Sequence, residues 1–332
     1  MTAGENRIAV LVPCYNEEKS IGRVISAFQE ALPEATVHVC DNDSSDGTLA
    51  AALAHGARVS REPLRGKGNV VRRMFANIEA DIYIMVDGDD TYDAGDAPAL
   101  VERLVKDNLD LVNARRVSQS GAAYRAGHRL GNQLLTSAAA LFFGRRLRDM
   151  LSGYKVMSRR FVKSFPSLSH GFEIETEIVV HALELRMPMA EVDSAYRARP
   201  EGTASKLRTV RDGISIAKSI LTLVKDERPL TFFSGVAVVL ALTALALGGP
   251  VVREYLQTGL VPRLPTAVAA TGVMLLASLA FVSGLILNTV TLGRREMKHL
   301  HYLGTPALEH AHRSEPKKAT PPRREHSAAA SV

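Results

Sequence analysis

Two aspartates placed two residues apart follow a short apolar run, and this spacing suits a metal ion. The run Asp81–Val86 (DIYIMV) leads directly into Asp87-Gly88-Asp89-Asp90. Carboxylates in an Asp-x-Asp pair can converge on a hard divalent cation such as Mg²⁺ or Mn²⁺, which commonly shares its oxygen ligands with a substrate phosphate. Asp90 and Asp93 either assist or are solvated turn residues. An ordinary turn is the alternative for the motif, but its place at the end of a strand favours the metal site.

A second motif, Arg65-Gly66-Lys67-Gly68-Asn69, combines two cations with two glycines. Flexible backbone beside cationic side chains suits a loop that closes over phosphates. The chain contains neither the GxxxxGK[ST] pattern of a P-loop nor a GxGxxG fingerprint, which argues against a nicotinamide enzyme.

These motifs require a scaffold that brings strand ends together, and the surrounding sequence predicts one. Apolar strands alternate with helical segments, which indicates an α/β fold with an open, mainly parallel sheet and helices on both faces. Ligands of such sheets bind beyond the carboxyl ends of the strands, where the polar motifs fall. The predicted strands are Arg7–Pro13, Thr36–Cys40, a short one at Val59, Asp81–Val86 and Leu109–Ala114, and the predicted helices include Glu18–Ala31 and Glu173–Arg186.

Two long uncharged stretches near the C-terminus, Leu230–Gly249 and Leu264–Gly293, are long enough to cross a membrane. The alternative is a buried helical hairpin, which rarely runs so long without polar residues. Lysines and arginines flank the outer ends of both stretches, so both termini and the N-terminal part are expected in the cytoplasm, as in a multi-pass inner-membrane protein. No signal peptide is expected, and two free cysteines fit a reducing compartment.

The sequence therefore divides into a cytoplasmic catalytic domain (1–207), a juxtamembrane amphipathic helix (208–228), two spans (229–293) and a basic tail (294–332) predicted to be disordered. The segment Leu134–Phe143 either contacts the membrane or packs against the domain.

Together the motifs resemble a known family. Pro13-Cys14-Tyr15-Asn16-Glu17, Asp41–Thr48, Arg65–Asn69 and Asp87-Gly88-Asp89 look like those of family-2 glycosyltransferases of GT-A fold. Asp149–Tyr154 and Arg199–Lys206 narrow the resemblance to polyprenyl-phosphate glycosyltransferases, a group that includes dolichyl-phosphate mannose synthases and bacterial undecaprenyl-phosphate sugar synthases. Asn42 and Thr91 depart from the commoner family residues, a second Asp and a Gln.

The resemblance implies roles at the matched positions. The nucleotide sugar would contact Pro13, Tyr15, Glu17, Asp41, Arg65, Lys67 and Asp87. The metal would be held by Asp87 and Asp89, and the acceptor phosphate by Arg115, Arg125, Arg129, Arg199, Ser205 and Lys206. Asp89 and Asp149 are the catalytic candidates. Asp149 would act as a base or an orienting group, or would simply pair with Arg145 or Arg148. Glu173 is a weaker candidate, because acidic residues also favour the first turn of a helix.

The implied reaction is the inverting transfer of a sugar from a nucleotide-diphosphate sugar to a polyprenyl phosphate, with a UDP-sugar favoured over a GDP-sugar. A homo-oligomer fits by analogy. Transfer to another lipid or lipid-linked saccharide, or a catalytically inactive membrane scaffold, remains an alternative. Processive polysaccharide synthases carry a Gln-x-x-Arg-Trp motif, which a chain without Trp cannot contain.

The charge distribution agrees with this division. Residues 1–110 carry a net charge of −8, residues 111–228 carry +9 and residues 229–332 carry +5. A uniformly basic protein would suggest a nucleic-acid partner. Here the acidic third holds the expected metal ligands, whereas the basic residues lie where a lipid phosphate and anionic headgroups are expected.

Overall fold

The computed structural model describes residues 6–118, 147–169, 171, 173–197, 221–222 and 225–308. Most of the predicted juxtamembrane helix 208–228, the segment Leu134–Phe143 and the tail residues 309–332 lie outside these described residues.

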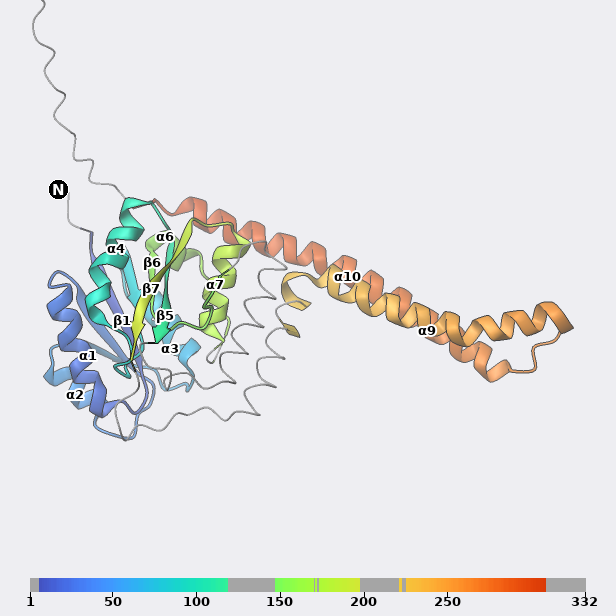
Figure 1. Ribbon diagram of the computed structural model, residues 1–332, viewed down its shortest axis with the longest axis horizontal. Coiled ribbons are helices and arrows are strands. Elements are labelled where there is room, and N and C mark those ends of the chain that lie inside the picture. Colours follow the sequence, from blue (N-terminus) through green and yellow to red (C-terminus); the bar gives the residue numbers. More distant parts are fainter. Residues whose placement is uncertain are drawn as a thin grey trace, which may run out of the picture.

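A seven-stranded sheet forms the centre of the N-terminal part (Figure 1). Its order is β3-β2-β1-β4-β6-β5-β7, and only β6 runs antiparallel to its neighbours. The prediction of an open, mainly parallel sheet is therefore confirmed. The strands are β1 (Ile8–Cys14), β2 (Thr36–Asp41), β3 (Arg58–Arg61), β4 (Ile82–Met85), β5 (Leu111–Ser118), β6 (Lys155–Ser158) and β7 (Met189–Tyr196).

Helices cover both faces of this sheet because its strands are apolar on both sides. In β1, Val10 and Val12 pack in the cluster that includes α1 and α4, whereas Ala9 and Leu11 pack in the cluster that includes α3, α6 and α7. The helices of this part are α1 (Glu18–Ala31), α2 (Thr48–Ala54), α3 (Lys67–Asn77), the 3₁₀ turn η1 (Ala94–Asp96), α4 (Ala97–Lys106), α6 (Arg159–Ser164) and α7 (Ile174–Glu184).

Two long helices, α9 (Pro229–Thr258) and α10 (Leu264–Gly304), form a hairpin that projects away from the sheet (Figure 1). Both are long and apolar enough to cross a membrane. The residues buried between them recur every seven positions and are mostly small: Ala237, Ala244 and Val251 in α9, and Ala270, Ala277, Gly284 and Thr291 in α10. Small residues at such spacing let two helix backbones approach closely. A Cβ added at Gly284 would lie 2.9 Å from the Cβ of Phe233. The remaining surfaces of both helices expose large apolar side chains.

Helix α10 does not end at Gly293, where its predicted span ends, but continues to Gly304 and docks on the domain that contains the sheet. The Tyr302 hydroxyl donates a hydrogen bond to Oδ2 of the fully buried Asp110 (2.8 Å), and the Arg160 guanidinium lies 4.9 Å from the centre of the Tyr302 ring. Lys298 Nζ lies 2.6 Å from Glu184 Oε2. The expectation that the disordered tail starts at residue 294 is therefore wrong for 294–304, because this segment is helical and pairs with buried carboxylates of the domain.

Candidate functional site

Three polar loops meet at one edge of the sheet, because β2, β1 and β4 are adjacent and parallel. Each loop holds one non-glycine residue with a left-handed backbone: Asn16 (φ 53°), Asp43 (φ 61°) and Asp90 (φ 60°). Asn and Asp tolerate this conformation better than other residues with a side chain, and such strain concentrates at functional sites. Asn42 N donates to Cys14 O (2.8 Å) and ties the first two loops together.

Asp41 lies at the end of β2 with only 2% of its surface exposed. Its Oδ2 accepts a hydrogen bond from Ser44 N (3.2 Å), but its Oδ1 is buried and has no hydrogen-bond partner among the described residues. A buried carboxylate oxygen without a donor is costly unless a ligand supplies one. The N–H of a nucleobase is a donor of this kind, which agrees with the predicted contact between Asp41 and the base.

The side chain of Asn42 holds in place the loop that contains Arg65–Asn69, which is predicted to close over phosphates. Its side-chain amide donates to Glu62 O (3.0 Å) and Leu64 O (2.8 Å), and its Oδ1 accepts from Gly66 N (2.7 Å). An aspartate could not make the first two bonds, which gives a structural reason for the departure from the commoner family residue. Gly66 itself has φ 126°, a conformation that favours glycine, and α3 begins directly after it with Lys67.

The side chains of Tyr15 and Arg65 face each other across this loop, with the guanidinium carbon 5.1 Å from the ring centre. Pro13 is half-buried near the end of β1. Glu17 precedes α1, and its carboxylate accepts a hydrogen bond from Ser20 Oγ (3.3 Å). The predicted nucleotide-binding residues all belong to the loops, strand ends or first helical residues at this one edge: Pro13, Tyr15, Glu17, Asp41, Arg65, Lys67 and Asp87.

Lys67 lies between two carboxylates at the centre of the site. Its Nζ is 2.5 Å from Asp87 Oδ1 and 2.5 Å from Glu175 Oε1. Burial opposes the charge on the ammonium, but the two carboxylates raise the pKa of Lys67 above its usual value. Burial raises the pKa of Glu175 despite the opposing charge of Lys67. The ion triad joins α3, the loop after β4 and the start of α7.

Asp87 and Asp89 supply the oxygen donors that a divalent cation requires. Asp87 is partly exposed, and Gly153 lies so close that a Cβ there would be 2.2 Å from Asp87 Oδ2. Asp89 is buried, and its Oδ1 accepts a hydrogen bond from Thr91 Oγ1 (2.6 Å). No group of three or more His, Cys, Asp or Glu that could hold a metal occurs among the described residues. Two carboxylates alone would suit an ion that takes its other ligands from a diphosphate and water, as Mg²⁺ commonly does.

The antiparallel strand β6 brings Asp149 to the same edge. Asp149 Oδ2 and Oδ1 each lie 2.8 Å from the Arg116 guanidinium, and Oδ2 also accepts from Arg116 N (3.2 Å). Burial would raise the pKa of Asp149, but the hydrogen bonds and charge of Arg116 lower it overall. The alternative considered for Asp149 was a pair with Arg145 or Arg148; the structure gives it a bidentate pair with Arg116, and Arg145 lies outside the described residues. A carboxylate with a lowered pKa suits an orienting group better than a base.

A fully buried lysine lies beneath this pair. Lys155 Nζ donates to Asn113 Oδ1 (2.6 Å), and Asn113 Nδ2 donates to Asp149 O (2.6 Å) and Glu191 Oε1 (3.1 Å). Burial lowers the pKa of Lys155 to about 8.

Two functional candidates were missed by the sequence analysis, Glu175 and Arg116. Arg115, which was expected to bind the acceptor phosphate, pairs with Asp193, its direct neighbour on β7 (Nε–Oδ1 2.6 Å). Glu173 lies away from the triad and lines a separate cavity, described below. The other predicted acceptor residues lie outside the described part of the chain: Arg125, Arg129, Arg199, Ser205 and Lys206.

Comparisons with known proteins agree with this geometry. Residues 9–165 match the protein family described as Glycosyl transferase family 2. An uncharacterized protein of Shigella flexneri is 55% identical over 46% of this chain and 94% of its own length. Glycosyltransferase AglJ of Haloferax volcanii is 30% identical over 89% of this chain and 98% of its own length. A dolichyl-phosphate hexose transferase of the same organism is 26% identical over 67% of this chain and 95% of its own length.

Among solved structures, the chain resembles glucosyl-3-phosphoglycerate synthase from Mycobacterium tuberculosis in complex with Mn²⁺, UDP-glucose and phosphoglyceric acid. The identity is 25% and the TM-score 0.53, covering 66% of this chain and 79% of the synthase. The fold is that of the GT-A glycosyltransferases, and the chain belongs to glycosyltransferase family 2.

Proposed function

We propose that this glycosyltransferase moves a sugar from a nucleotide-diphosphate sugar to a polyprenyl phosphate at the cytoplasmic face of the membrane. The observation that carries the proposal is the docking of α10: the same helix that is apolar enough to cross a membrane pairs with buried Glu184 and Asp110 of the catalytic domain. An enzyme fixed in this way to two membrane helices would act on an acceptor that the bilayer presents. A relative named as a dolichyl-phosphate hexose transferase supports a lipid phosphate as that acceptor.

The donor side of the proposal rests on Asp41, Lys67 and Asp87. Asp41 Oδ1 would accept an N–H of the base, a donor that the N3–H of uracil and the N1–H of guanine both provide. The related synthase structure contains UDP-glucose and Mn²⁺. In this chain Asp87 and Asp89 would hold Mg²⁺ or Mn²⁺, which when bound would stabilise the negative charge on the leaving diphosphate. Lys67 would hold the Asp87 carboxylate in position.

On the acceptor side, a polyprenyl phosphate is already an anion, so its attack on the anomeric carbon needs little help from a base. Asp149 would then orient the Arg116 guanidinium toward the incoming phosphate. Arg115 and the predicted residues between 125 and 206 remain proposed phosphate contacts. A single displacement inverts the anomeric configuration.

The test uses the purified full chain with a panel of UDP- and GDP-sugars, undecaprenyl phosphate and Mg²⁺ or Mn²⁺, and mass spectrometry of the lipid product. We expect one lipid-phosphate sugar that is lost with EDTA and with Asp87→Asn or Asp89→Asn. Asp90→Asn, whose carboxylate pairs with Arg23, is the matched control and should keep its activity. Transfer only to a lipid-linked saccharide or to a soluble phosphorylated acid, or no transfer from any donor, would overturn the proposal.

A further inference from the structure

Three polar side chains form a row across neighbouring strands of the sheet. Lys155 on β6, Asn113 on β5 and Glu191 on β7 lie opposite one another, because Asn113 is in register with both of the others. Side chains in register on adjacent strands point to the same face of a sheet and can touch. Lys155 and Asn113 are fully buried, and Glu191 is partly buried. The sequence analysis predicted none of the three as a site residue.

Hydrogen bonds connect this row in a fixed order. Lys155 Nζ donates to Asn113 Oδ1 (2.6 Å), and Asn113 Nδ2 donates to Glu191 Oε1 (3.1 Å). An ammonium group can only donate and a carboxylate can only accept, so the amide of Asn113 cannot turn over without losing both bonds. The buried Lys155 therefore helps to fix the direction in which the Nδ2 donor of Asn113 points.

The row holds the backbone of Asp149. Asn113 Nδ2 donates to Asp149 O (2.6 Å), and Glu191 Oε1 accepts from Asp149 N (3.2 Å). Glu191 Oε2 also accepts from Arg148 N (2.8 Å). Both backbone polar groups of Asp149 are thus bound by side chains of the row, one on β5 and one on β7. Because each backbone group has its partner in the row, Asp149 can move only if these bonds break.

Asp149 in turn holds Arg116. Its two carboxylate oxygens each lie 2.8 Å from the guanidinium, whose carbon lies 5.6 Å from the centre of the Tyr196 ring. A bidentate pair fixes the orientation of both groups, so a shift of the Asp149 backbone would move the guanidinium. Burial would raise the pKa of Asp149, but Arg116 lowers it and the charge of Lys155 adds to that effect. The row therefore acts on this pair through both geometry and charge.

We propose that Lys155, Asn113 and Glu191 are positioning residues for the acceptor phosphate, because they fix the backbone of Asp149 and Asp149 aims Arg116. None of the three would touch a substrate. The inference rests on the function proposed above for the identity of the acceptor. The donor side has its own triad around Lys67, so loss of the row should weaken acceptor binding and leave donor binding intact.

The main variant is Asn113→Asp. It keeps an oxygen for Lys155 and gives this buried cation a charged partner, but it removes both bonds that Nδ2 donates. Full-length protein in detergent is compared with wild type in three measurements that need no turnover. They are binding of undecaprenyl phosphate by native mass spectrometry, binding of UDP with Mn²⁺ by calorimetry, and hydrogen–deuterium exchange of backbone amides. Asn77→Asp, at the exposed end of α3, controls for the added charge.

In Asn113→Asp we expect undecaprenyl phosphate to bind about tenfold more weakly, in the range of one hydrogen bond to a charged group. UDP should bind as it does to wild type. Exchange of the amides of Arg116, Arg148 and Asp149 should become faster by about tenfold, because their acceptors are no longer held. Exchange in β1 should not change, and Asn77→Asp should match wild type in all three measurements.

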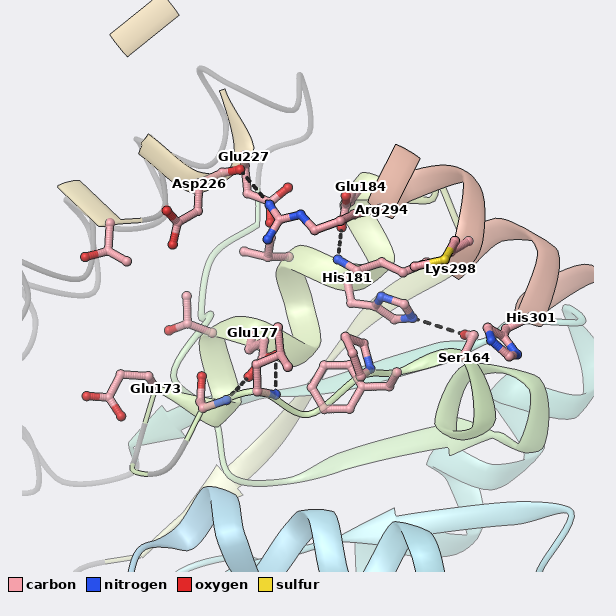
Figure 2. A pocket seen from close by; sticks show the side chains of 18 of the residues that line it. Ser164, Glu173, Glu177, His181, Glu184, Asp226, Glu227, Arg294, Lys298 and His301 are labelled. Atoms are coloured by element: carbon pink, nitrogen blue, oxygen red, sulfur yellow. Dashed lines mark hydrogen bonds and ion pairs between the residues drawn. The ribbon is translucent and has the colours of Figure 1, made fainter. Parts of the chain in front are cut away.

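Glu191→Gln tests the other end of the row against a matched control. Glu177 makes the same arrangement elsewhere, since its two carboxylate oxygens accept from Leu168 N and Ser169 N, both at 2.8 Å. It does so at the wall of a separate cavity between α7 and α10 (Figure 2). Each substitution places an amide NH₂ against a backbone N–H, so Glu191→Gln and Glu177→Gln should lose similar stability. Only Glu191→Gln should weaken the binding of undecaprenyl phosphate.

Three results would overturn the inference. They are unchanged exchange at Arg148 and Asp149 in Asn113→Asp, unchanged binding of undecaprenyl phosphate despite faster exchange, and an equal loss of UDP binding, which would make the row a support of the whole site. A wild-type protein that binds no undecaprenyl phosphate refutes the acceptor of the proposed function. In that case faster exchange in Asn113→Asp still supports the hold of the row on Asp149 and Arg116, and unchanged exchange overturns it.

Discussion

Gly153 lies against the carboxylate of Asp87, and a Cβ at this position would be 2.2 Å from Oδ2. The contact exists because β6 runs antiparallel to β4, with Lys155 opposite Met85, so the loop before β6 crosses the end of β4. The proposed metal ligand is therefore positioned by a residue far away in the sequence.

Replacing Gly153 tests this positioning. Gly153→Ala should push the Asp87 carboxylate aside and lower kcat/KM for sugar transfer by roughly 10- to 100-fold, since displacements of about 1 Å at a reacting centre have such effects. Gly272→Ala, where a Cβ meets nothing within 4 Å, is the control. Wild-type kinetics in Gly153→Ala would show that Asp87 can move without consequence.

The Lys67 triad makes an ordered prediction about stability. Lys67→Met leaves the buried Glu175 and the partly exposed Asp87 without their cation and should cost about 3–5 kcal/mol of unfolding free energy. Glu175→Gln should cost less, because Lys67 keeps Asp87 as a partner. A double-mutant cycle, measured by urea unfolding in detergent, should give a coupling of about 1 kcal/mol or more between Lys67 and Glu175. Additive effects of the two substitutions would mean that the ion pair is not coupled.

Asn42 allows a direct test of a family departure. Asn42→Asp restores the commoner family residue but removes the donors to Glu62 O and Leu64 O. We expect a loss of about 1–3 kcal/mol in stability, together with a higher KM for the donor as the loop that carries Arg65 and Lys67 loosens. Asn77→Asp, at the exposed end of α3, should stay within about 0.5 kcal/mol of wild type. An unchanged KM for the donor would show that this loop does not contribute to donor binding.

The docking of α10 predicts that Arg295 and Lys298 contribute strongly to the stability of the protein, although they lie far from the sheet in the sequence. Arg295→Met combined with Lys298→Met removes both cationic partners of Glu184, whose side chain is 2% exposed. The full chain should lose about 3–5 kcal/mol, because a buried charge is left uncompensated. Glu296→Gln, on the same turn but exposed, should change little. If the double variant unfolds at the wild-type denaturant concentration, α10 does not contribute to the stability of the catalytic domain.

Lys155 predicts a pH dependence of stability. Its pKa of about 8 in the folded protein lies below the value of about 10.4 expected when it is unfolded. Between these values only the unfolded chain binds the proton, so this group makes unfolding less favourable as pH rises from about 8 to 10.4. The change amounts to about 3 kcal/mol, since one pKa unit is worth about 1.4 kcal/mol.

The difference between wild type and Lys155→Met isolates this contribution from other groups that titrate in the same range. From about pH 8 to 10.4, the free energy of unfolding of wild type should rise relative to that of Lys155→Met. The corresponding difference between wild type and the exposed Lys106→Met should not change with pH. A flat Lys155 difference would place its pKa near the ordinary lysine value.

Local patterns were sufficient to predict the parts of the site that lie on consecutive strand ends. Apolar runs such as DIYIMV end in polar clusters, and parallel neighbours must place these clusters at one edge. Helix α1 begins and ends where its periodicity predicted, at Glu18 and Ala31. Strand β6 is only four residues long, and so short a pattern does not indicate that the strand runs antiparallel. The contact between Gly153 and Asp87, which depends on that direction, could therefore not be predicted.

The sequence did not indicate which of two chemically alike neighbours points its side chain into the site. Arg115 and Arg116 alternate across β5, and either could face the site. Glu173 directly precedes α7 and Glu175 lies in its first turn. Apolar residues are buried on most sides of this helix, so its periodicity does not indicate which glutamate points inward. Packing of Ile174, Ile178 and Ala182 against the sheet decides this, and it selects Glu175.

The docking of α10 also orders events during synthesis. Asp110 and Glu184 are made early in the chain, but Tyr302 and Lys298 emerge from the ribosome only after both apolar helices. A nascent catalytic domain therefore holds Glu184, whose cationic partners have not yet been translated, whereas Asp110 already has Ser158 and Arg160 as partners and lacks only Tyr302. Its final consolidation has to wait for the helical hairpin, so synthesis of both apolar helices precedes completion of the enzyme.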